Sequence, residues 1–463
     1  MKTKFLLFTL FFLAAMQVKA NNMLVKNVTT TGDNSANKTI QVQFDMSWDN
    51  SWRDGINWDA AWVFMKYKDT NGNWKHVQLN TTGFANGTGT ANTIQVGNDK
   101  VGAFVYRSAP GTGTFGATTM QLQWNYGLSG LTSVTGLEIR VFAIEMVYVP
   151  QGDFNVAKTF NNSTQENIFL SINNPGNNLL VYRNFTAPGD NFIVVNNQLS
   201  PTLTYNDGTS ATIRIKGDAG IDTDNNGIVD NSGYPAGYKA FYCYKFELTE
   251  NQYADFLNTL TSTQQTTLGV AGSNISLNNG QYFSSTPYKA CGNSTETRLL
   301  AYADWSGLRP ISLLEFNKAS YGPIKPKYYQ SGCSGGIIIQ GYPSWGSSSA
   351  GGCNYGVNQL LVNVGSFATA TSTRVQSGAS YYGVLDLTGN AHEPVVKMNY
   401  FNFQNTNGNG VLTTDGDADV SNWNSTEMIT YIDMICNGFF NFNCGVNVFS
   451  PAKYGFRYVR SAE

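Results

Sequence analysis

Apolar and polar side chains alternate along several early segments of the chain. Between Thr39 and Trp48 every second residue is apolar, and the apolar set is Ile40, Val42, Phe44, Met46 and Trp48. Successive side chains of a strand point to opposite faces, so this period of two predicts a half-buried strand. The segments Met120–Trp124 and Leu137–Ala143 alternate in the same way and predict two more strands.

Turn-forming residues separate these segments. Asp69–Gly72 lies between the apolar pairs Trp62/Phe64 and Val77/Leu79 and predicts a hairpin. Short strands joined by Gly, Asn and Thr turns over residues 21–145 predict an antiparallel β-sandwich domain. Three tryptophans of this domain are candidates for a sugar-stacking platform, although packing at the end of the sandwich is the favoured interpretation: Trp48, Trp52 and Trp58.

Helical periodicity begins in the second half of the chain. Thr249 and Gln252 form a capping box, and the apolar stripe that follows indicates an amphipathic helix: Tyr253, Phe256, Leu257 and Leu260. A second helix is expected near Arg298–Trp305 with Gly307 as its stop. A third is expected from the Ser312/Glu315 capping box to Gly322. The sequence therefore predicts that residues 146–463 form an α+β domain with many irregular segments.

The first residues and the composition limit the classes of function that the protein can have. Lys2, Lys4, the apolar run Phe5–Met16 and the small residues around Ala20 predict a secretory signal over residues 1–20. We therefore expect export across the inner membrane to the periplasm or cell surface, with no transmembrane segment. Charged residues make up 13% of the chain, with 29 Lys+Arg against 31 Asp+Glu and no basic cluster, which excludes a nucleic-acid binder.

Six cysteines in an exported chain favour disulfides: Cys243, Cys291, Cys333, Cys353, Cys436 and Cys444. Cys333 and Cys353 bracket a Gly/Ser-rich loop, and Cys436 and Cys444 form a second local candidate pair. The connectivity stays open, because six cysteines allow fifteen pairings.

Six ordered sequence blocks across residues 146–460 carry a family resemblance. They are Met146–Phe154, Phe241–Thr249, Ala301–Pro310 with Glu315–Phe316 after it, Val364–Phe367, Gly383–Glu393 and Gly455–Arg457. In this order they resemble the formylglycine-generating-enzyme, or sulfatase-modifying-factor, family, here in an exported bacterial protein. The resemblance implies a C-type-lectin-like α+β fold for residues 146–463, with an insertion at about 157–239. It does not cover residues 1–145.

The chain does not preserve the cysteine pattern on which the family's catalysis depends. Catalytic members bind Cu(I) through two cysteines near the C-terminus, and thiolates suit this soft ion. Here Cys436 and Cys444 stand further apart than the family pair, and Asn437–Phe442 replaces the expected Gly-Gly-Ser-Trp stretch. We therefore expect a non-catalytic chain, with a copper-dependent formylglycine-generating oxidase using Cys436 and Cys444 as the alternative.

The small number of histidines limits the catalytic sites and metal sites that the chain can form. The chain has two histidines, which restricts any Ser-His-Asp triad, Cys-His dyad or zinc site. His76 is expected to be solvated in the hairpin. His392 stands where the family usually has Trp and is expected to pack rather than to transfer protons.

Calcium is the favoured cofactor, as a structural ion. One acidic loop carries oxygen ligands at spacings typical of a calcium loop, with Gly227 at the bend: Asp222, Asp224, Asn226, Ile228 through its carbonyl, and Asp230. An Asx-rich turn without metal is the alternative. The resemblance implies a second site at Gly389, Asn390, Ala391 and Glu393, although these residues would equally hold the loop by hydrogen bonds. Asp415, Asp417 and Asp419 form a third oxygen-rich turn.

These observations favour a binding or accessory module of the cell surface or envelope, whose partner is a protein or a glycan. The family resemblance implies accessory roles in gliding, secretion or adhesion. The expected ligand-binding surface lies in an Asn- and Phe-rich segment, where these side chains combine contact area with adaptable hydrogen bonds: Asn437, Phe439, Phe440, Asn441, Phe442 and Asn443. Packing of these aromatic residues in the core stays open. A ligand-binding protein diversified at Asn codons is a third hypothesis.

Overall fold

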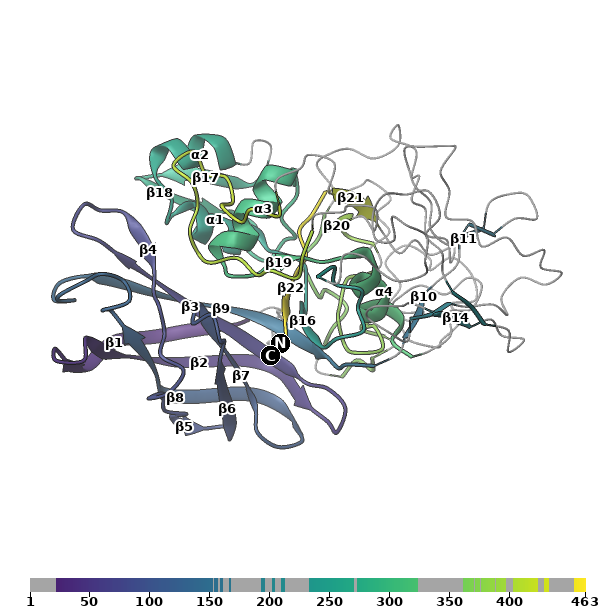
Figure 1. Cartoon of the computed structure of the whole chain (residues 1–463), viewed down its shortest axis with the longest axis horizontal. Helices are drawn as coiled ribbons and strands as arrows, with labels where there is room; N and C mark the ends of the chain where they lie inside the picture. The colour runs from purple at the N-terminus through teal and green to yellow at the C-terminus, as the bar shows by residue number, and fades with distance from the viewer. Residues whose placement is uncertain are drawn as a thin grey trace, which may run out of the picture.

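The computed structural model describes a β-rich chain with a few short helices. The described residues are 22–152, 154–156, 159–160, 166–167, 193–195, 202–204, 210–212, 233–269, 273–323, 361–369, 371–374, 376–387, 389–396, 403–423, 429–432 and 454–463. Strands β1 to β9 form what we call the N-terminal region, and the described segments from residue 233 onward form the C-terminal region (Figure 1).

A smaller antiparallel sheet has the strand order β1-β2-β8-β5. Its strands are β1 (Leu24–Asn34), β2 (Thr39–Arg53), β8 (Gly111–Asn125) and β5 (Thr88–Gly89). The alternation from Thr39 to Trp48 is confirmed, because the apolar residues of this stretch are buried and the polar residues between them are half-buried. The strand predicted around Met120–Trp124 lies in β8 and pairs with β2.

A larger antiparallel sheet has the strand order β19-β22-β16-β9-β3-β7-β6, with β4 paired to β3. Its strands are β3 (Asp59–Lys68), β4 (Trp74–His76), β6 (Asn92–Val96), β7 (Gly102–Arg107), β9 (Glu138–Val149), β16 (Phe241–Tyr244), β19 (Arg309–Pro310) and β22 (Tyr458–Ser461). The predicted hairpin at Asp69–Gly72 is confirmed, because β3 and β4 pair across it.

This larger sheet joins the two regions. Strand β9 pairs with β3 of the N-terminal region on one side and with β16 of the C-terminal region on the other. The boundary drawn between residues 145 and 146 therefore falls inside β9. The last strand, β22, lies in the middle of the molecule beside β16 (Figure 1). Continuous backbone hydrogen bonds make the two regions one framework.

One apolar cluster, the inter-sheet core, lies between the two sheets. It combines side chains from β2 and β8 of the smaller sheet with side chains from β3 of the larger sheet. Its members include Val42, Phe44, Met46, Trp48, Ala61, Val63, Met65, Phe115, Met120, Leu122 and Trp124. Inward-facing residues of both sheets thus supply this core, as the alternating patterns require.

Four helices of the described chain cover the C-terminal region: α1 (Glu250–Leu257), α2 (Ser262–Leu268), α3 (Glu296–Trp305) and α4 (Leu313–Tyr321). The predicted capping boxes at Thr249 and Ser312 are both present. Gly307 and Gly322 follow α3 and α4 with positive φ angles of 72° and 56°, as expected of helix stops. Helix α2 was not predicted from the sequence, although Thr261 and Gln264 form a capping box at its start.

Short two-stranded pairs complete the described elements. They are β10 (Phe154–Val156) with β13 (Ile193–Val195), β11 (Thr159–Phe160) with β12 (Glu166–Asn167), β14 (Thr202–Thr204) with β15 (Ser210–Thr212), β17 (Ile275–Asn278) with β18 (Gln281–Ser284), and β20 (Glu393–Val396) with β21 (Ile429–Ile432). Within the described ranges, no helix has both the length and the apolar character required to cross a bilayer.

A second apolar cluster, the junction core, lies where the helices pack on the larger sheet. Its aromatic members come from both regions and include Trp62, Phe64, Phe104, Tyr242, Tyr253, Phe256, Tyr302, Trp305, Phe456 and Tyr458. The indole Nε1 of Trp62 donates to the carbonyl of Ser306 at 2.8 Å. Arg460 places its guanidinium 4.1 Å from the Trp62 ring and pairs with Asp99 at 2.6 Å. Packing and polar contacts together thus fix the C-terminal region on the N-terminal region.

Candidate functional site

Several site residues expected from the sequence lie outside the described residues. These are the acidic loop Asp222–Asp230, the cysteines Cys436 and Cys444, and the surface segment Asn437–Asn443. The calcium, copper and surface hypotheses that depend on them stay predictions. Cys333 and Cys353 also lie outside the described ranges, so their pairing stays a prediction as well.

The turn Gly389–Glu393 is described and is buried. The Asn390 amide donates to the Glu247 carboxylate, and the backbone N–H of Ala391 donates to the same carboxylate at 2.8 Å. Asn390 also accepts from the backbone N–H of Val362 at 2.9 Å. The turn therefore holds the neighbouring chain segments together through Glu247.

Glu393 pairs with a buried arginine. Its carboxylate accepts from Nε and Nη2 of Arg457 at 2.9 and 2.8 Å, and Arg457 also donates to the carbonyls of Tyr244 and Leu385. A calcium ion at this turn would meet the positive charge of that guanidinium. Burial, with Asp386 and Glu393 nearby, holds the pKa of Glu247 well above its ordinary value. The calcium hypothesis for this turn stays a prediction.

The third oxygen-rich turn is tied to helix α3. Asp304 accepts from the backbone N–H groups of Asn409 and Asp419 at 2.8 Å each. Asp419 in turn accepts from the side chain of Asn409, whereas Asp415 and Asp417 are exposed. Among the residues that the structure describes, no group of three or more His, Cys, Asp or Glu side chains is placed to hold a metal ion.

Two described cysteines are free thiols inside the protein. Cys243 and Cys291 are both buried and unpaired. Burial raises the pKa of Cys243 to about 12, and burial raises the pKa of Cys291 as well. The reactive form of cysteine is the thiolate, so these two residues are chemically inert packing groups at neutral pH.

The expectation that His76 is solvated is wrong. Its side chain is only 6% exposed, because β4 turns it under the C-terminal region, and its Nε2 lies 2.6 Å from the carbonyl of Val101. Burial, followed by the nearby charge of Lys66, lowers the pKa of His76 well below its ordinary value. His392 is also buried and lies beside the ring of Tyr454, as expected of a packing residue.

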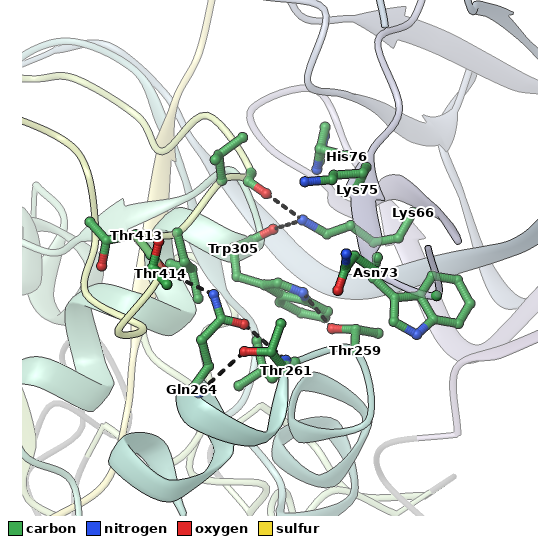
Figure 2. A pocket seen from close by; sticks show the side chains of 16 residues that line it. Lys66, Asn73, Lys75, His76, Thr259, Thr261, Gln264, Trp305, Thr413 and Thr414 are labelled. Carbon is green, nitrogen blue, oxygen red and sulfur yellow. Dashed lines mark hydrogen bonds between the residues drawn. The ribbon is translucent and has the colours of Figure 1, made fainter. Parts of the chain in front are cut away.

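A small pocket lies above this part of the junction. It has a volume of about 300 Å³, and Figure 2 shows Lys66, Asn73 and Lys75 on one side of it, with Thr259, Thr261 and Gln264 from the α1–α2 corner on the other. The Lys66 ammonium donates to the carbonyls of Trp305 and Gly410, both at 2.7 Å. We call this cavity the Lys66 pocket. Its lysine acts as a hydrogen-bond donor that docks the two regions.

A larger cavity, the junction pocket, lies at the other end of the contact between the regions. It has a volume of about 600 Å³. The lining residues of the N-terminal region are Asn50, Ser51, Trp52, Asp54, Asn57, Thr112 and Gly113. Those of the C-terminal region are Lys245, Ala368, Thr369, Ser372, Arg374, Ser377, Ala379, Tyr381, Tyr382, Gly383 and Leu385. This size falls in the range of small-molecule sites, roughly 300–1,000 Å³.

Three aromatic residues line the junction pocket: Trp52, Tyr381 and Tyr382. Trp52 is half-buried at the end of β2, so part of its ring remains accessible. The other two candidate tryptophans pack instead. Trp48 is buried against Phe115 with a ring distance of 3.9 Å, and Trp58 stacks on Tyr148 at 4.0 Å. The favoured packing interpretation is therefore confirmed for Trp48 and Trp58.

Hydrogen bonds hold the polar wall of the junction pocket in place. The Asn57 amide donates to the carbonyl of Tyr382 at 2.7 Å, which ties the N-terminal wall to the C-terminal wall. The guanidinium of Arg374 donates to the carbonyl of Tyr381 at 2.8 Å and lies 5.6 Å from the Tyr381 ring. Asp54 accepts from the backbone N–H groups of the turn at Ile56 and Asn57. The site is thus largely preformed.

A buried charge cluster forms the floor of the junction pocket. The Lys245 ammonium lies 3.0 Å from Asp59 and 3.0 Å from Glu145. Burial, opposed by the charge of Lys245, raises the pKa of Glu145 to about 7. Carboxylates on both sides of Lys245 raise its pKa above the ordinary value despite burial. Lys245 is therefore a charged structural group, not a neutral nucleophile.

The described lining of the junction pocket consists mainly of aromatic rings and neutral polar groups. Among the described lining residues, the junction pocket contains neither cysteine nor histidine, and Asp54 is its one carboxylate. A nucleophile with an adjacent base, which covalent catalysis requires, is not among them. The sequence signal that pointed here was the tryptophan cluster. The partner residues 368–385 lie about 320 positions later in the chain, too far for sequence spacing to connect them.

No protein-family model matches this chain, and a comparison with curated proteins finds no similar sequence.

Proposed function

We propose that the chain is a non-catalytic binding module of the bacterial cell surface or envelope, exported by its first twenty residues. In this proposal the N-terminal region is an antiparallel β-sandwich, and the C-terminal region is a C-type-lectin-like domain of the sulfatase-modifying-factor type. The junction pocket receives a protein segment or a glycan. Accessory roles in gliding, secretion or adhesion fit such a module.

The observation that carries this proposal is the junction pocket itself. Both regions build it, aromatic rings and polar side chains line it, and hydrogen bonds between and within its walls fix its shape. A preformed pocket loses little conformational entropy when a ligand binds, which favours affinity. Strand β9 also holds the two walls of the pocket in fixed positions, because it pairs with strands of both regions.

The state of the described reactive groups supports the absence of catalysis. The thiols of Cys243 and Cys291 have raised pKa values, and the buried groups Lys245, Arg457 and Lys66 are engaged in ion pairs or in hydrogen bonds to the backbone. Calcium at Asp222–Asp230 or Gly389–Glu393 would serve as a structural ion in this proposal. Retention of the protein by its target should then fall when a calcium chelator is added.

Co-sedimentation with the envelope fraction of the producing organism tests the proposal. The purified chain without residues 1–20 should sediment with washed envelope fragments. The variant Trp52→Ala with Tyr381→Ala should lose at least about tenfold in apparent affinity, because aromatic anchors carry most of the binding energy in such sites. The matched control is Trp74→Ala, which removes a half-buried tryptophan from the Lys66 pocket.

Two results would contradict the proposal. One is a wild-type chain that does not sediment with the envelope at any concentration. The other is equal retention of the wild-type chain and the junction variant. Circular dichroism spectra of all variants should coincide, and Trp52→Phe with Tyr381→Phe provides a milder pair if the alanine variant does not fold.

A further inference from the structure

We propose that the ligand of the junction pocket is an uncharged oligosaccharide, bound but not cleaved. This inference rests on the proposed binding function and names the ligand class for the same site. Four features carry it: the size of the pocket, its accessible aromatic rings, the balance of charge on its walls, and the single carboxylate among its described lining residues.

The size of the pocket favours a small ligand or the end of a chain. A stable contact between two globular proteins covers roughly 800 Å² on each partner and is nearly flat. The junction pocket is instead a concave space of about 600 Å³ between two walls. Such a cavity is large enough for a few sugar units.

Two half-buried rings offer the apolar surface that a sugar ring requires. Trp52 comes from the end of β2, and Tyr381 comes from the opposite wall of the C-terminal region. The face of an aromatic ring carries partial negative charge, so it attracts the polarised C–H groups of a pyranose. The hydroxyls of the same sugar can then bond to the polar groups around the rings.

The chain fixes the position of Trp52 closely. Its backbone N–H donates to Asp59 at 2.9 Å, and its ring packs on Gly383. Gly383 has a φ of +91°, and a Cβ at this position would fall 2.8 Å from the Trp52 ring. Glycine is therefore required there both for the backbone conformation and for the ring position. Any larger residue would displace the stacking surface.

Charge balance on the walls favours an uncharged ligand. At the rim, the exposed cation Arg374 is balanced by the exposed carboxylate of Asp54. At the floor, Lys245 is already paired with two carboxylates. Among the described lining residues, a polyanion such as a phosphorylated or uronic chain would find Arg374 as the one cation without a carboxylate partner, and Asp54 would repel it.

The remaining polar groups are neutral donors and acceptors. They include the side chains of Asn50, Thr112, Thr369 and Ser372, of which Thr369 and Ser372 already accept hydrogen bonds from each other's backbone N–H groups. An acyl chain would strip the polar lining of water without replacing the lost hydrogen bonds, which is unfavourable. Sugar hydroxyls donate and accept, so they can replace that water at Asn50 and Thr112. This match selects a saccharide over a lipid.

Binding without cleavage follows from the carboxylates. Glycoside hydrolysis requires, in most enzymes, two carboxyl groups on either side of the scissile bond. Among the described lining residues, Asp54 is the only one, since Asp59 and Glu145 lie below the floor in contact with Lys245. A bound oligosaccharide is therefore expected to leave the pocket intact.

Calorimetric titration with defined trisaccharides tests the inference. The neutral probes are maltotriose, cellotriose, xylotriose, mannotriose and triacetylchitotriose; the comparison probes are trigalacturonate and trialanine. At least one neutral probe should bind, and no neutral probe should be cleaved. Trp52→Ala should weaken binding about tenfold, and Trp52→Phe should weaken it less. Gly383→Ala should weaken it through the displaced ring, whereas Trp74→Ala should leave the affinity unchanged.

A second arm separates this inference from the proposed function. Envelope fragments are treated either with periodate, which cleaves the vicinal diols of sugars, or with a protease, and are washed before the sedimentation assay. Loss of retention after periodate but not after protease supports a saccharide ligand. Retention that survives periodate and disappears after protease would overturn the saccharide and leave the binding function standing. Binding of trigalacturonate or trialanine in preference to every neutral probe would overturn it too. No retention on untreated fragments would contradict both.

Discussion

The inter-sheet core and the junction core are stabilised in different ways. The inter-sheet core consists of apolar side chains from alternating strand positions, such as Val42 and Phe44. Around the junction core lie fully buried ions, including the pairs Arg457–Glu393 and Lys245–Glu145. Apolar burial has no preferred direction, whereas an ion pair requires defined partners at defined distances. The first core should therefore tolerate changes of shape, and the second should not tolerate the loss of a partner.

Removal of the Arg457 guanidinium should have the largest effect. Arg457→Met leaves the Glu393 carboxylate and the carbonyls of Tyr244 and Leu385 without this buried donor. Breaking a buried pair in this way costs about 3–5 kcal/mol of the free energy of unfolding. Urea denaturation followed by circular dichroism measures the loss.

Two further variants make this prediction specific. Arg140→Met removes an arginine from a partly exposed pair with Glu138 and should cost less than about 1 kcal/mol. Glu393→Leu added to Arg457→Met should recover part of the stability, because the buried carboxylate that has lost the guanidinium is then gone. A loss below about 1 kcal/mol for Arg457→Met would refute the difference between the two cores.

The same difference explains how far the sequence could be interpreted. The alternation at Thr39–Trp48 and the capping boxes at Thr249 and Ser312 are local patterns, and the structure confirms each of them. The pairing of β9 with β16 and the contact of Arg457 with Glu393 join segments far apart in the chain. No periodicity encodes such contacts.

The candidate site also depends on contacts between segments that are far apart in the chain. Trp52 stood out in the sequence as one of three tryptophans, but nothing nearby showed that it, and neither Trp48 nor Trp58, would line the junction pocket. That outcome depends on Gly383 and Tyr381, which meet Trp52 only after the two regions dock. The burial of His76 was missed for this reason as well, since a hairpin with Lys75 beside it resembles a solvated one until the C-terminal region covers it.

The charge cluster of the junction core should give the protein a specific pH dependence. The pKa of Glu145 is raised to about 7 in the folded protein, so the folded state holds this proton more tightly than the unfolded state does. The resulting stabilisation is complete below the unfolded pKa, about 4.5, and is lost as the pH rises to about 7. The rise in the pKa of Glu145 corresponds to a change of about 3 kcal/mol in the free energy of unfolding across this pH range.

Glu145→Gln isolates this contribution. The glutamine cannot ionise, so the free energy of unfolding of the variant, relative to the wild type, should rise between pH 4.5 and pH 7.5. His76 acts in the opposite direction, because its lowered pKa destabilises the folded state as the pH falls below about 6.5, and it is unchanged in both proteins. Urea denaturation at several pH values measures the difference. A constant difference across this range would show that Glu145 ionises normally in the fold.

The smallest expected effect is that of a volume-conserving change in the inter-sheet core. Met120 is fully buried and pairs across the sheet with Phe44. Met120→Leu should cost less than about 1.5 kcal/mol, because the two side chains have similar volumes and the surrounding residues can repack. The matched change in the junction core is Arg457→Lys, which keeps the charge but cannot reach Glu393, Tyr244 and Leu385 together. Each buried acceptor left without a donor costs about 1–3 kcal/mol, so the lysine variant should lose more than the leucine variant in the same urea experiment. Equal losses would mean that directional contacts do not distinguish the junction core from the inter-sheet core.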